Sequence, residues 1–239
     1  MDTQHERTAA QRLHQPADGE KAEGEMKAIV YDAYGSPDVL RLEDVPRPKP
    51  GDEDVLIRVR AASVNSWDWD NLTGAGGGVG SFAVQLAKAY GAEVTGIDRG
   101  DKLDFTRSLG ADHVIDYTVR DFTEVSRRYD AILDVTAHRS MFAYRRVLGL
   151  SGGYHMIGGE TRRILEALVM GGVLKICRSS RSFGILMHRP NCGVSYFVGL
   201  FESGKVLPSI DRIYPLSETR EALRRIGEGS VLGKVVISV

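Results

Sequence analysis

The stretch "GAGGGVG", residues 74–80, decides the fold that this sequence predicts. Its glycines recur as Gly74-x-x-Gly77-x-x-Gly80, and the full G-x-G-x-x-G spacing of a dinucleotide-binding turn is missed because position 75 is alanine. Backbone without side chains can approach a pyrophosphate closely, and the helix that follows would aim its free N–H groups at that phosphate. We therefore predict a phosphate-binding turn, against the alternative of a flexible turn without a ligand.

The residues after the turn alternate between helical and extended patterns. Helix patterns cover 81–90, 101–109 and 139–148, and "FTEVSRRY" is also helix-like. The intervening extended runs are "AEVTGID", "DHVIDY", "AILDV" and "YHMIG". Strands that alternate with helices indicate a parallel sheet with helical crossovers, so the predicted fold class is α/β. Gly80 would let the first helix pack tightly against that sheet.

The run "AEVTGID" ends in Asp98, about 20 residues after the turn, where a dinucleotide-binding fold places the acid that binds the ribose hydroxyls. Its carboxylate favours NAD by repelling a 2′-phosphate, whereas Arg99 and Lys102 would counter that charge and admit NADP. The alternative is a solvated charged loop. The choice of cofactor stays open, with a slight preference for NAD. The turn residues expected to contact the cofactor are Gly77, Gly78, Val79 and Gly80.

The residues before the turn make a poor buried strand. A parallel strand buried on both faces is nearly continuously apolar, but positions 68–71 are Asp-Trp-Asp-Asn. Burial of two carboxylates and an amide without partners would cost several kcal/mol. That is a large share of a total stability of roughly 5–15 kcal/mol. We therefore expect a frayed strand or a rearranged sheet here.

β-rich segments flank the alternating region. From 26 to about 62 the pattern is strand and turn, with an alternating strand expected at Val55–Val59. From 205 to the end the chain has a strand "IDRIYPL", a helix "SETREALRRIGEG" with Ser217 as N-cap, and a closing strand "GKVVISV".

Composition favours an ordinary globular protein of one large domain or two small ones. The 239 residues are 42% hydrophobic and 26% charged, and the net charge of −1 gives no electrostatic reason to expect nucleic acid or an anionic membrane as partner. The two cysteines, Cys177 and Cys192, lie in no metal-binding spacing and are expected to be reduced, in the cytoplasm. Residues 1–25 lack the apolar core of a signal peptide and are expected to form a disordered polar tail.

Several stretches together resemble the medium-chain dehydrogenase/reductase superfamily, most closely its zinc-independent quinone oxidoreductase branch. They are "MKAIVYDAYGSPDVLRLEDVPRPKPGDEDVLIRVRAASVNSWDWD", "GGGVGSFAVQLAKAYGAEVTGID", "SLGADHVIDY", "YDAILDVTA", "GGYHMIGG" and "PLSETREALRRIGEGSVLGKVVISV". The resemblance implies a Rossmann-type doubly wound parallel sheet with a GroES-like β-rich catalytic part. It also implies NAD(P)H as hydride donor and a small-molecule quinone, enone or related carbonyl as acceptor.

The resemblance also implies an internal deletion. After "SWDWDNLTG" the family continues through most of the catalytic domain and the first Rossmann strand, whereas this chain passes directly to "AGGGVG". The stretch 164–177 is expected to lie in the core, or to pair as a strand across a homodimer as in the family. The expected organisation is a tail at 1–25, a truncated GroES-like part at 26–73, a Rossmann domain at 74–204 and a C-terminal return to the catalytic part at 205–239.

Asn65 and Asp68, in "VNSWD", are the catalytic candidates, because the resemblance places that loop near the nicotinamide or the substrate. An amide can orient a carbonyl and a carboxylate can relay a proton, although both residues also favour turns. No metal is expected, since Asn65 lies near the place of the family's ligand cysteine and the histidines show no ligand spacing. The resemblance also implies that Tyr117 lies against the adenosine end of the cofactor and Lys234 near its nicotinamide end. The remaining cofactor candidates, at the carboxyl ends of strands, are Val135, Ile157 and Gly158.

Two interpretations follow. In the first, the protein is an NAD(P)H-dependent oxidoreductase that transfers hydride to an acceptor held between its two parts. In the second, it is a catalytically impaired nucleotide-binding remnant, because the missing block should supply one wall of the substrate cleft and exclude water from it.

Overall fold

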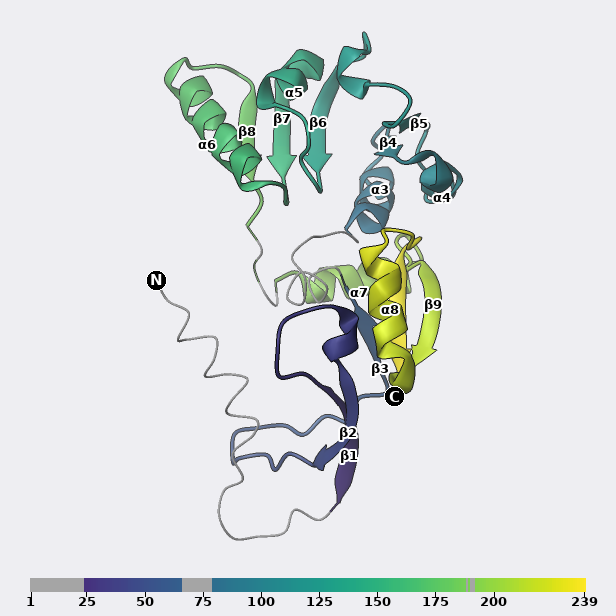
Figure 1. Ribbon diagram of the computed structural model, residues 1–239. Helices are drawn as coiled ribbons and strands as arrows, with labels where there is room; N and C mark the ends of the chain where they lie inside the picture. The colour runs from purple at the N-terminus through teal and green to yellow at the C-terminus, as the bar shows by residue number, and fades with distance from the viewer. Residues whose placement is uncertain (1–23, 66–78, 188, 190–191) are drawn as a thin grey trace.

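The structure, a computed structural model, describes residues 24–65, 79–187, 189 and 192–239. Its strands form four small sheets (Figure 1). Two sheets contain the strands from the two ends of the described chain, and two contain parallel strands from its middle. The expected tail at 1–25 therefore lies outside the described residues except for its last two positions, and Glu25 already belongs to a strand.

The β-rich part consists of an antiparallel hairpin and a mixed sheet. The hairpin joins β1 (Glu25–Val30) to β2 (Arg41–Pro46). In the mixed sheet, β10 (Lys234–Ser238) lies between β3 (Ala61–Val64), which is antiparallel to it, and β9 (Ile210–Pro215), which is parallel. Helix α8 (Thr219–Gly227) covers this sheet with Ala222 and Leu223 buried (Figure 1). The C-terminal strand β10 thus pairs with β3, from the N-terminal part of the described chain.

The first parallel sheet pairs β4 (Thr95–Asp98) with β5 (His113–Asp116). Helix α4 (Leu103–Ser108) packs closely on it, because the Thr106 side chain occupies the space that a Cβ on Gly96 would need. Helix α3 (Gly80–Ala89) precedes β4 and buries none of its residues. Lys88 at its last turn bonds both carboxylate oxygens of Asp112, at 2.9 and 2.8 Å, which ties α3 to the start of β5.

The second parallel sheet holds the main core. Its middle strand is β7 (Leu148–Met156), flanked by β6 (Tyr129–Asp134) and β8 (Ser182–Ile185). Helices α5 (Met141–Val147) and α6 (Thr161–Ile176) pack with it. The apolar side chains of these elements form one buried cluster of Phe122, Ala137, Met141, Tyr144, Leu148, Tyr154, Met156, Ala167, Met170, Leu174 and Phe183.

The order of the parallel strands explains why there are two sheets. Placed side by side, they give β5-β4 and then β6-β7-β8. A Rossmann sheet has the order 3-2-1-4-5-6, so these strands match positions 3-2 and 4-5-6, and the position of strand 1 falls between β4 and β6. The expected α/β class with parallel strands is confirmed, but the described strands do not form one continuous doubly wound sheet.

Some local predictions are wrong. Residues 55–59 form no strand, and "FTEVSRRY" contains only a 3-10 helix at Phe122–Glu124. The stretch 164–177 lies almost entirely in helix α6, so it is not a strand. Ser217 is not the N-cap of α8, because a 3-10 helix at Leu216–Glu218 precedes that helix and Glu218 takes the cap position.

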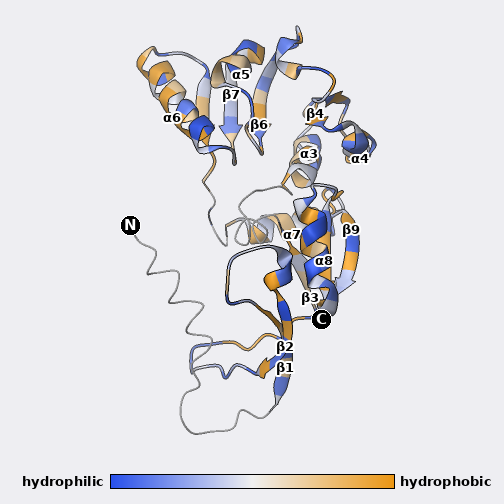
Figure 2. Cartoon of the chain, in the orientation of Figure 1, coloured by the Kyte–Doolittle hydropathy of each residue, from blue (hydrophilic) through white to orange (hydrophobic). Residues whose placement is uncertain are grey.

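Helix α6 is rich in apolar residues, which are orange in Figure 2, and several of them are exposed. Leu165, Leu168 and Val169 are 58, 58 and 66% exposed, although Ala167, Met170 and Leu174 on the opposite side are buried. Helix α7 (Val194–Glu202), which follows β8 in the chain, is also strongly apolar but buries only Leu200. The stretch predicted as core is therefore core on one face only.

Candidate dinucleotide site

The carboxyl ends of β4 and β5 bring together the residues expected at the adenosine end of a cofactor. Asp98 closes β4 and Tyr117 follows β5, and the Tyr117 amide donates a hydrogen bond to the Asp98 carbonyl at 3.2 Å. The Asp98 Oδ1 atom accepts the Arg99 amide at 2.8 Å. The Tyr117 side chain is 45% exposed, which leaves its ring accessible at this edge.

The Arg99 guanidinium is hydrogen-bonded to Asp101 rather than to Asp98. Its Nε and Nη2 atoms donate to the two Asp101 oxygens at 2.9 and 2.8 Å. These hydrogen bonds raise the pKa of Arg99 and lower the pKa of Asp101. Lys102 ends the short 3-10 helix that carries Asp101. Among the residues that the structure describes, the Arg99 backbone amide is the donor to the Asp98 carboxylate and no side chain donates to it, so Asp98 Oδ2 accepts no hydrogen bond there.

The carboxyl ends of β6 and β7 bring together a second group of predicted residues. The Ile157 amide donates to the Asp134 carbonyl at 2.8 Å, and the Gly158 carbonyl accepts the Ala137 amide at 3.1 Å. A Cβ on Gly158 would lie 3.1 Å from the Val135 carbonyl oxygen, so glycine permits this close approach. Val135, Ile157 and Gly158 therefore lie together, as expected for the ends of adjacent parallel strands.

A buried pair of tyrosines beneath this edge was not predicted from the sequence. Tyr154 is fully buried in β7 and its hydroxyl donates to Asp134 Oδ2 at 2.8 Å. Tyr144 packs on it with ring centroids 4.7 Å apart. Burial, and then the charge of Asp134, raises the pKa of both tyrosines. Two features of the sequence could have indicated this contact: the carboxylate at the end of "AILD" and the tyrosine in the next predicted strand.

The C-terminal part brings a catalytic candidate and a cofactor candidate into contact. The Lys234 Nζ atom donates to Asn65 Oδ1 at 2.7 Å, across the pairing of β10 with β3. The same Nζ atom lies 5.6 Å from the centre of the Phe82 ring on α3. The family resemblance predicts Asn65 and Lys234 separately near the nicotinamide end of the cofactor. In the structure the two side chains are in contact with each other, beside α3.

The turn itself is described only at its end. Asp68, Gly77 and Gly78 lie outside the described residues. Val79 is 43% exposed and holds the N-cap position of α3 with no side-chain hydrogen bond to the helix, so its first amides have no side-chain cap. Among the described residues, a Cβ on Gly80 would meet nothing within 4 Å, so this part of the structure does not show the predicted close packing of Gly80 on the sheet.

The metal-ligating residue types do not form a zinc site in the part of the chain that the structure describes. No group of three or more His, Cys, Asp or Glu side chains that could hold a metal ion occurs among the described residues. Both cysteines are free and exposed. Nor does the described part of the chain contain a helix with the length and apolar character needed to cross a membrane.

Parallel strands joined by helices, with polar residues gathered at their carboxyl ends, define an α/β protein of the class that binds ligands at that edge. Residues 109–237, more than half of the chain, match the zinc-binding dehydrogenase family, and the protein belongs to that family. This confirms the predicted resemblance to the medium-chain dehydrogenase/reductase superfamily.

Two curated relatives illustrate the similarity. The chain is 29% identical over 189 residues to the mitochondrial NAD(P)H oxidoreductase RTN4IP1 of Mus musculus, covering 70% of this chain and 47% of the relative. It is 30% identical over 170 residues to the chloroplastic quinone-oxidoreductase QR1 of Triphysaria versicolor, covering 70% of this chain and 51% of the relative. The chain thus spans about half the length of the curated relatives that it matches.

A solved structure supports the fold. The quinone oxidoreductase from Coxiella burnetii superimposes with a TM-score of 0.73, covering 90% of this chain and 100% of that one at 22% identity. At this identity the likeness shows the shared α/β architecture with its parallel strands.

Proposed function

We propose that the protein is an NAD(P)H-dependent oxidoreductase that transfers hydride to a quinone, enone or related carbonyl acceptor. The observation that carries the proposal is the Asp98 carboxylate at the carboxyl end of β4, with one oxygen open and Tyr117 bonded beside it. That is where a dinucleotide-binding sheet holds the adenosine ribose. The NAD(P)H oxidoreductase and quinone-oxidoreductase relatives support the same chemistry.

The described residues suit a dinucleotide better than a metal. When bound, the nicotinamide supplies the hydride, and the protein supplies binding and orientation. Asp98 would accept hydrogen bonds from the ribose hydroxyls, and Tyr117 would lie against the adenosine. Val135, Ile157 and Gly158 would line the path of the cofactor along the second sheet. Zinc has no role in this proposal.

The Asn65–Lys234 pair would act at the acceptor end. Two hydrogen bonds position the side-chain amide of Asn65. Its Oδ1 atom accepts from Lys234 Nζ at 2.7 Å, and its Nδ2 atom donates to the Ser63 carbonyl at 3.2 Å. Lys234 begins β10 and Asn65 directly follows β3, so both residues are attached to paired strands, which hold a polar group more firmly than a loop does. An ammonium group beside an amide can orient an acceptor carbonyl and stabilise the negative charge that develops on its oxygen.

We assign the cofactor preference to NADH. Of the two cations that could bind a 2′-phosphate, Arg99 already forms two hydrogen bonds with Asp101, which leaves Lys102 alone for that role. The open Asp98 carboxylate would repel the phosphate as well. The predicted ability of Arg99 to admit NADP is therefore opposed by its partner.

A second candidate, a nucleotide-binding remnant without turnover, has its own support. An internal deletion of the first Rossmann strand and of most of the catalytic part would account for two separate parallel sheets and for a helix α3 with no buried residue. It would also remove one wall of the acceptor cleft. The half-length match to the curated relatives is compatible with such a loss.

Fluorescence titration of the purified protein with NADH and with NADPH tests the proposal. NADH should bind to the wild-type protein. Asp98→Asn should weaken NADH binding about tenfold or more, because a charge-assisted hydrogen bond is lost. The control Asp104→Asn, at a side chain that is 97% exposed, should leave NADH binding unchanged. A panel of quinones and enones then separates the candidates: turnover supports the enzyme, and binding without turnover supports the remnant. No binding of either coenzyme to a folded sample refutes both.

A further inference from the structure

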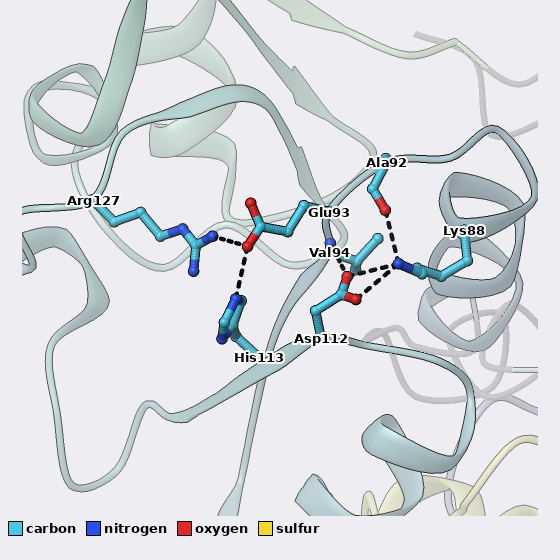
Figure 3. Close-up of polar contacts among 7 residues, drawn as sticks. All are labelled: Lys88, Ala92, Glu93, Val94, Asp112, His113 and Arg127. Carbon is cyan, nitrogen blue, oxygen red and sulfur yellow. Dashed lines mark hydrogen bonds and ion pairs between the residues drawn. The ribbon is translucent and has the colours of Figure 1, made fainter.

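A polar cluster fixes the amino ends of β4 and β5 against each other. Asp112, just before β5, accepts the Val94 amide at 2.7 Å, and Lys88 Nζ bonds both of its carboxylate oxygens (Figure 3). The Asp112 and His113 amides in turn donate to the Val94 carbonyl at 2.9 and 3.1 Å. His113 Nε2 also lies 2.9 Å from Glu93 Oε1. These contacts fix the register of one strand against the other.

That register brings two aspartates level at the opposite ends of the strands. Thr95 pairs with His113, and three residues further on Asp98 pairs with Asp116. Side chains at paired positions of neighbouring strands point to the same face of a sheet, and the strands lie about 4.8 Å apart. The two aspartates therefore stand side by side at the carboxyl edge, where the proposed ribose site lies.

The Asp116 carboxylate is held by a neighbour in the sequence and not by a cation. Its Oδ1 atom accepts the Thr118 amide at 2.8 Å and the Thr118 hydroxyl at 2.6 Å. In the part of the chain that the structure describes, its Oδ2 atom accepts no hydrogen bond and forms no ion pair. Like charges at paired strand positions repel each other. The negative charge of Asp116 thus adds to that of Asp98 at this edge.

Asp116 also lies against the loop that follows β4. A Cβ on Gly100 would lie 2.5 Å from Asp116 Oδ2, so the lack of a side chain at position 100 lets the carboxylate approach the loop backbone. The same loop carries Arg99 and Lys102, the two cations that could bind a 2′-phosphate. Arg99 is already hydrogen-bonded to Asp101. A further negative charge therefore borders the loop on which any recognition of a 2′-phosphate would depend.

From this placement we infer that Asp116 is a second acid of the ribose end and, together with Asp98, excludes a coenzyme that carries a 2′-phosphate. The inference rests on the proposed function, in which Asp98 holds the ribose. In the Rossmann order β4 and β5 take positions 2 and 3, and the pyrophosphate binds at the turn after position 1. Asp116 is thus on the side of Asp98 away from the pyrophosphate. Three carboxylates, those of Asp98, Asp101 and Asp116, oppose two cations there and repel a phosphate.

Fluorescence titrations with NADH and with NADPH test the inference, and the quantity compared is the ratio of the two dissociation constants. Asp116→Asn keeps an oxygen that can accept from Thr118 and removes the charge. It should tighten NADPH binding at least about fivefold relative to NADH binding. The matched control Asp104→Asn, at a side chain 97% exposed on α4, should leave the ratio unchanged. Equal weakening of both coenzymes by Asp116→Asn would show a structural role and overturn the inference.

Salt separates a charge effect from a change of shape. The shift caused by Asp116→Asn should be larger at about 0.1 M salt than at about 1 M, where the Debye length falls to about 3 Å. Asp116→Ser removes the same charge and should change the ratio in the same direction, which covers the case in which Asp116→Asn fails to fold. If NADH binds and both variants keep the wild-type ratio, the inference alone is overturned. If neither coenzyme binds to the folded wild-type protein, the proposed function is overturned with it.

Discussion

If the proposed function is right, Asp101 would limit the ability of Arg99 to bind a 2′-phosphate, because it holds the Arg99 guanidinium through two hydrogen bonds. We predict that Asp101→Asn frees Arg99 and raises NADPH affinity several-fold, with little change for NADH, since Asp98 is untouched. Parallel fluorescence titrations of the two coenzymes measure this ratio. Asp104→Asn removes a nearby exposed carboxylate and serves as control. An unchanged NADPH affinity would show that Arg99 does not face the ribose.

Two tyrosines in the second sheet differ in what their hydroxyls contact. The Tyr154 hydroxyl donates to Asp134 at 2.8 Å, whereas the Tyr129 hydroxyl is buried with no hydrogen-bond partner in the described structure. Tyr154→Phe should therefore lower the free energy of unfolding by about 1–3 kcal/mol. Tyr129→Phe should be neutral or stabilising by about 1 kcal/mol, because it removes an unsatisfied polar group. Urea denaturation of both variants compares them, and equal losses would contradict the assignment.

The Asp211–Arg225 pair predicts a pH dependence of stability. Asp211, only 8% exposed, accepts from Arg225 Nε at 2.6 Å and from Nη2 at 3.1 Å, and these bonds lower its pKa. A carboxylate with a lowered folded-state pKa stabilises the protein fully above its ordinary pKa of about 3.9, and this stabilisation is lost as the pH falls through the lower value.

Arg225→Met should accordingly cost about 1–3 kcal/mol at pH 7. The difference from wild type should stay constant down to about pH 5 and shrink below about pH 4, where Asp211 takes up a proton. Urea denaturation at a series of pH values measures it. Arg107→Met is the control, since its Asp104 partner is exposed and such pairs contribute about 0–1 kcal/mol. A difference that grows as the pH falls would refute the role of the pair.

Helix α6 approaches β8 through one of two adjacent glycines. A Cβ on Gly171 would lie 2.6 Å from the Phe183 carbonyl oxygen, whereas a Cβ on Gly172 would meet nothing within 4 Å. Gly171→Ala should destabilise the protein by about 1–3 kcal/mol, because the helix must move away from the strand. Gly172→Ala should stabilise it by about 0.5–1 kcal/mol through helix propensity. Thermal unfolding of the two variants gives the sign, and the same sign for both would contradict this packing.

Periodicity predicted most of the helices and strands, and it failed where a partner decides the structure. The helix pattern over 81–90 matches α3 (Gly80–Ala89), because the hydrogen bonds of a helix join residues close together in the sequence. Residues 55–59 alternate correctly but form no strand, since a strand needs a neighbour to bond. The apolar run 164–177 fits either a helix or a strand, and its 16-residue helix shows that length is the better guide.

At the scale of the whole molecule, the sequence predicted the edge on which the site residues lie better than it predicted their contacts. The carboxyl ends of neighbouring parallel strands meet at one edge of their sheet. This places Asp98 and Tyr117 together at the ends of β4 and β5, and Val135 and Gly158 together at the ends of β6 and β7. The contact of Lys234 with Asn65 depends on β10 pairing with β3, more than 160 residues apart, which no local pattern reveals. Tertiary pairing of this kind is the part that a single sequence leaves undetermined.

The division of the parallel strands between two sheets predicts an uneven stability across the molecule. The large buried cluster belongs to β7 and its neighbours, whereas the sheet of β4 and β5 has two strands and carries an α3 with no buried residue. Two-stranded sheets are marginally stable alone. Local opening should therefore be easiest around β4, in a unit distinct from the main core.

Hydrogen exchange of the purified protein should show that difference. Amides of Gly153–Met156 in β7, which has a strand on each side, should exchange at least roughly a hundredfold more slowly than those of Thr95–Asp98 in β4, a difference of about 2.7 kcal/mol in opening free energy. Arg127→Gln breaks the ion pair to Glu93 and should speed exchange in β4 while leaving β7 unchanged. Arg107→Gln, on the exposed side of α4, should change neither strand. One common exchange rate for β4 and β7 would mean that the two sheets open as a single cooperative unit.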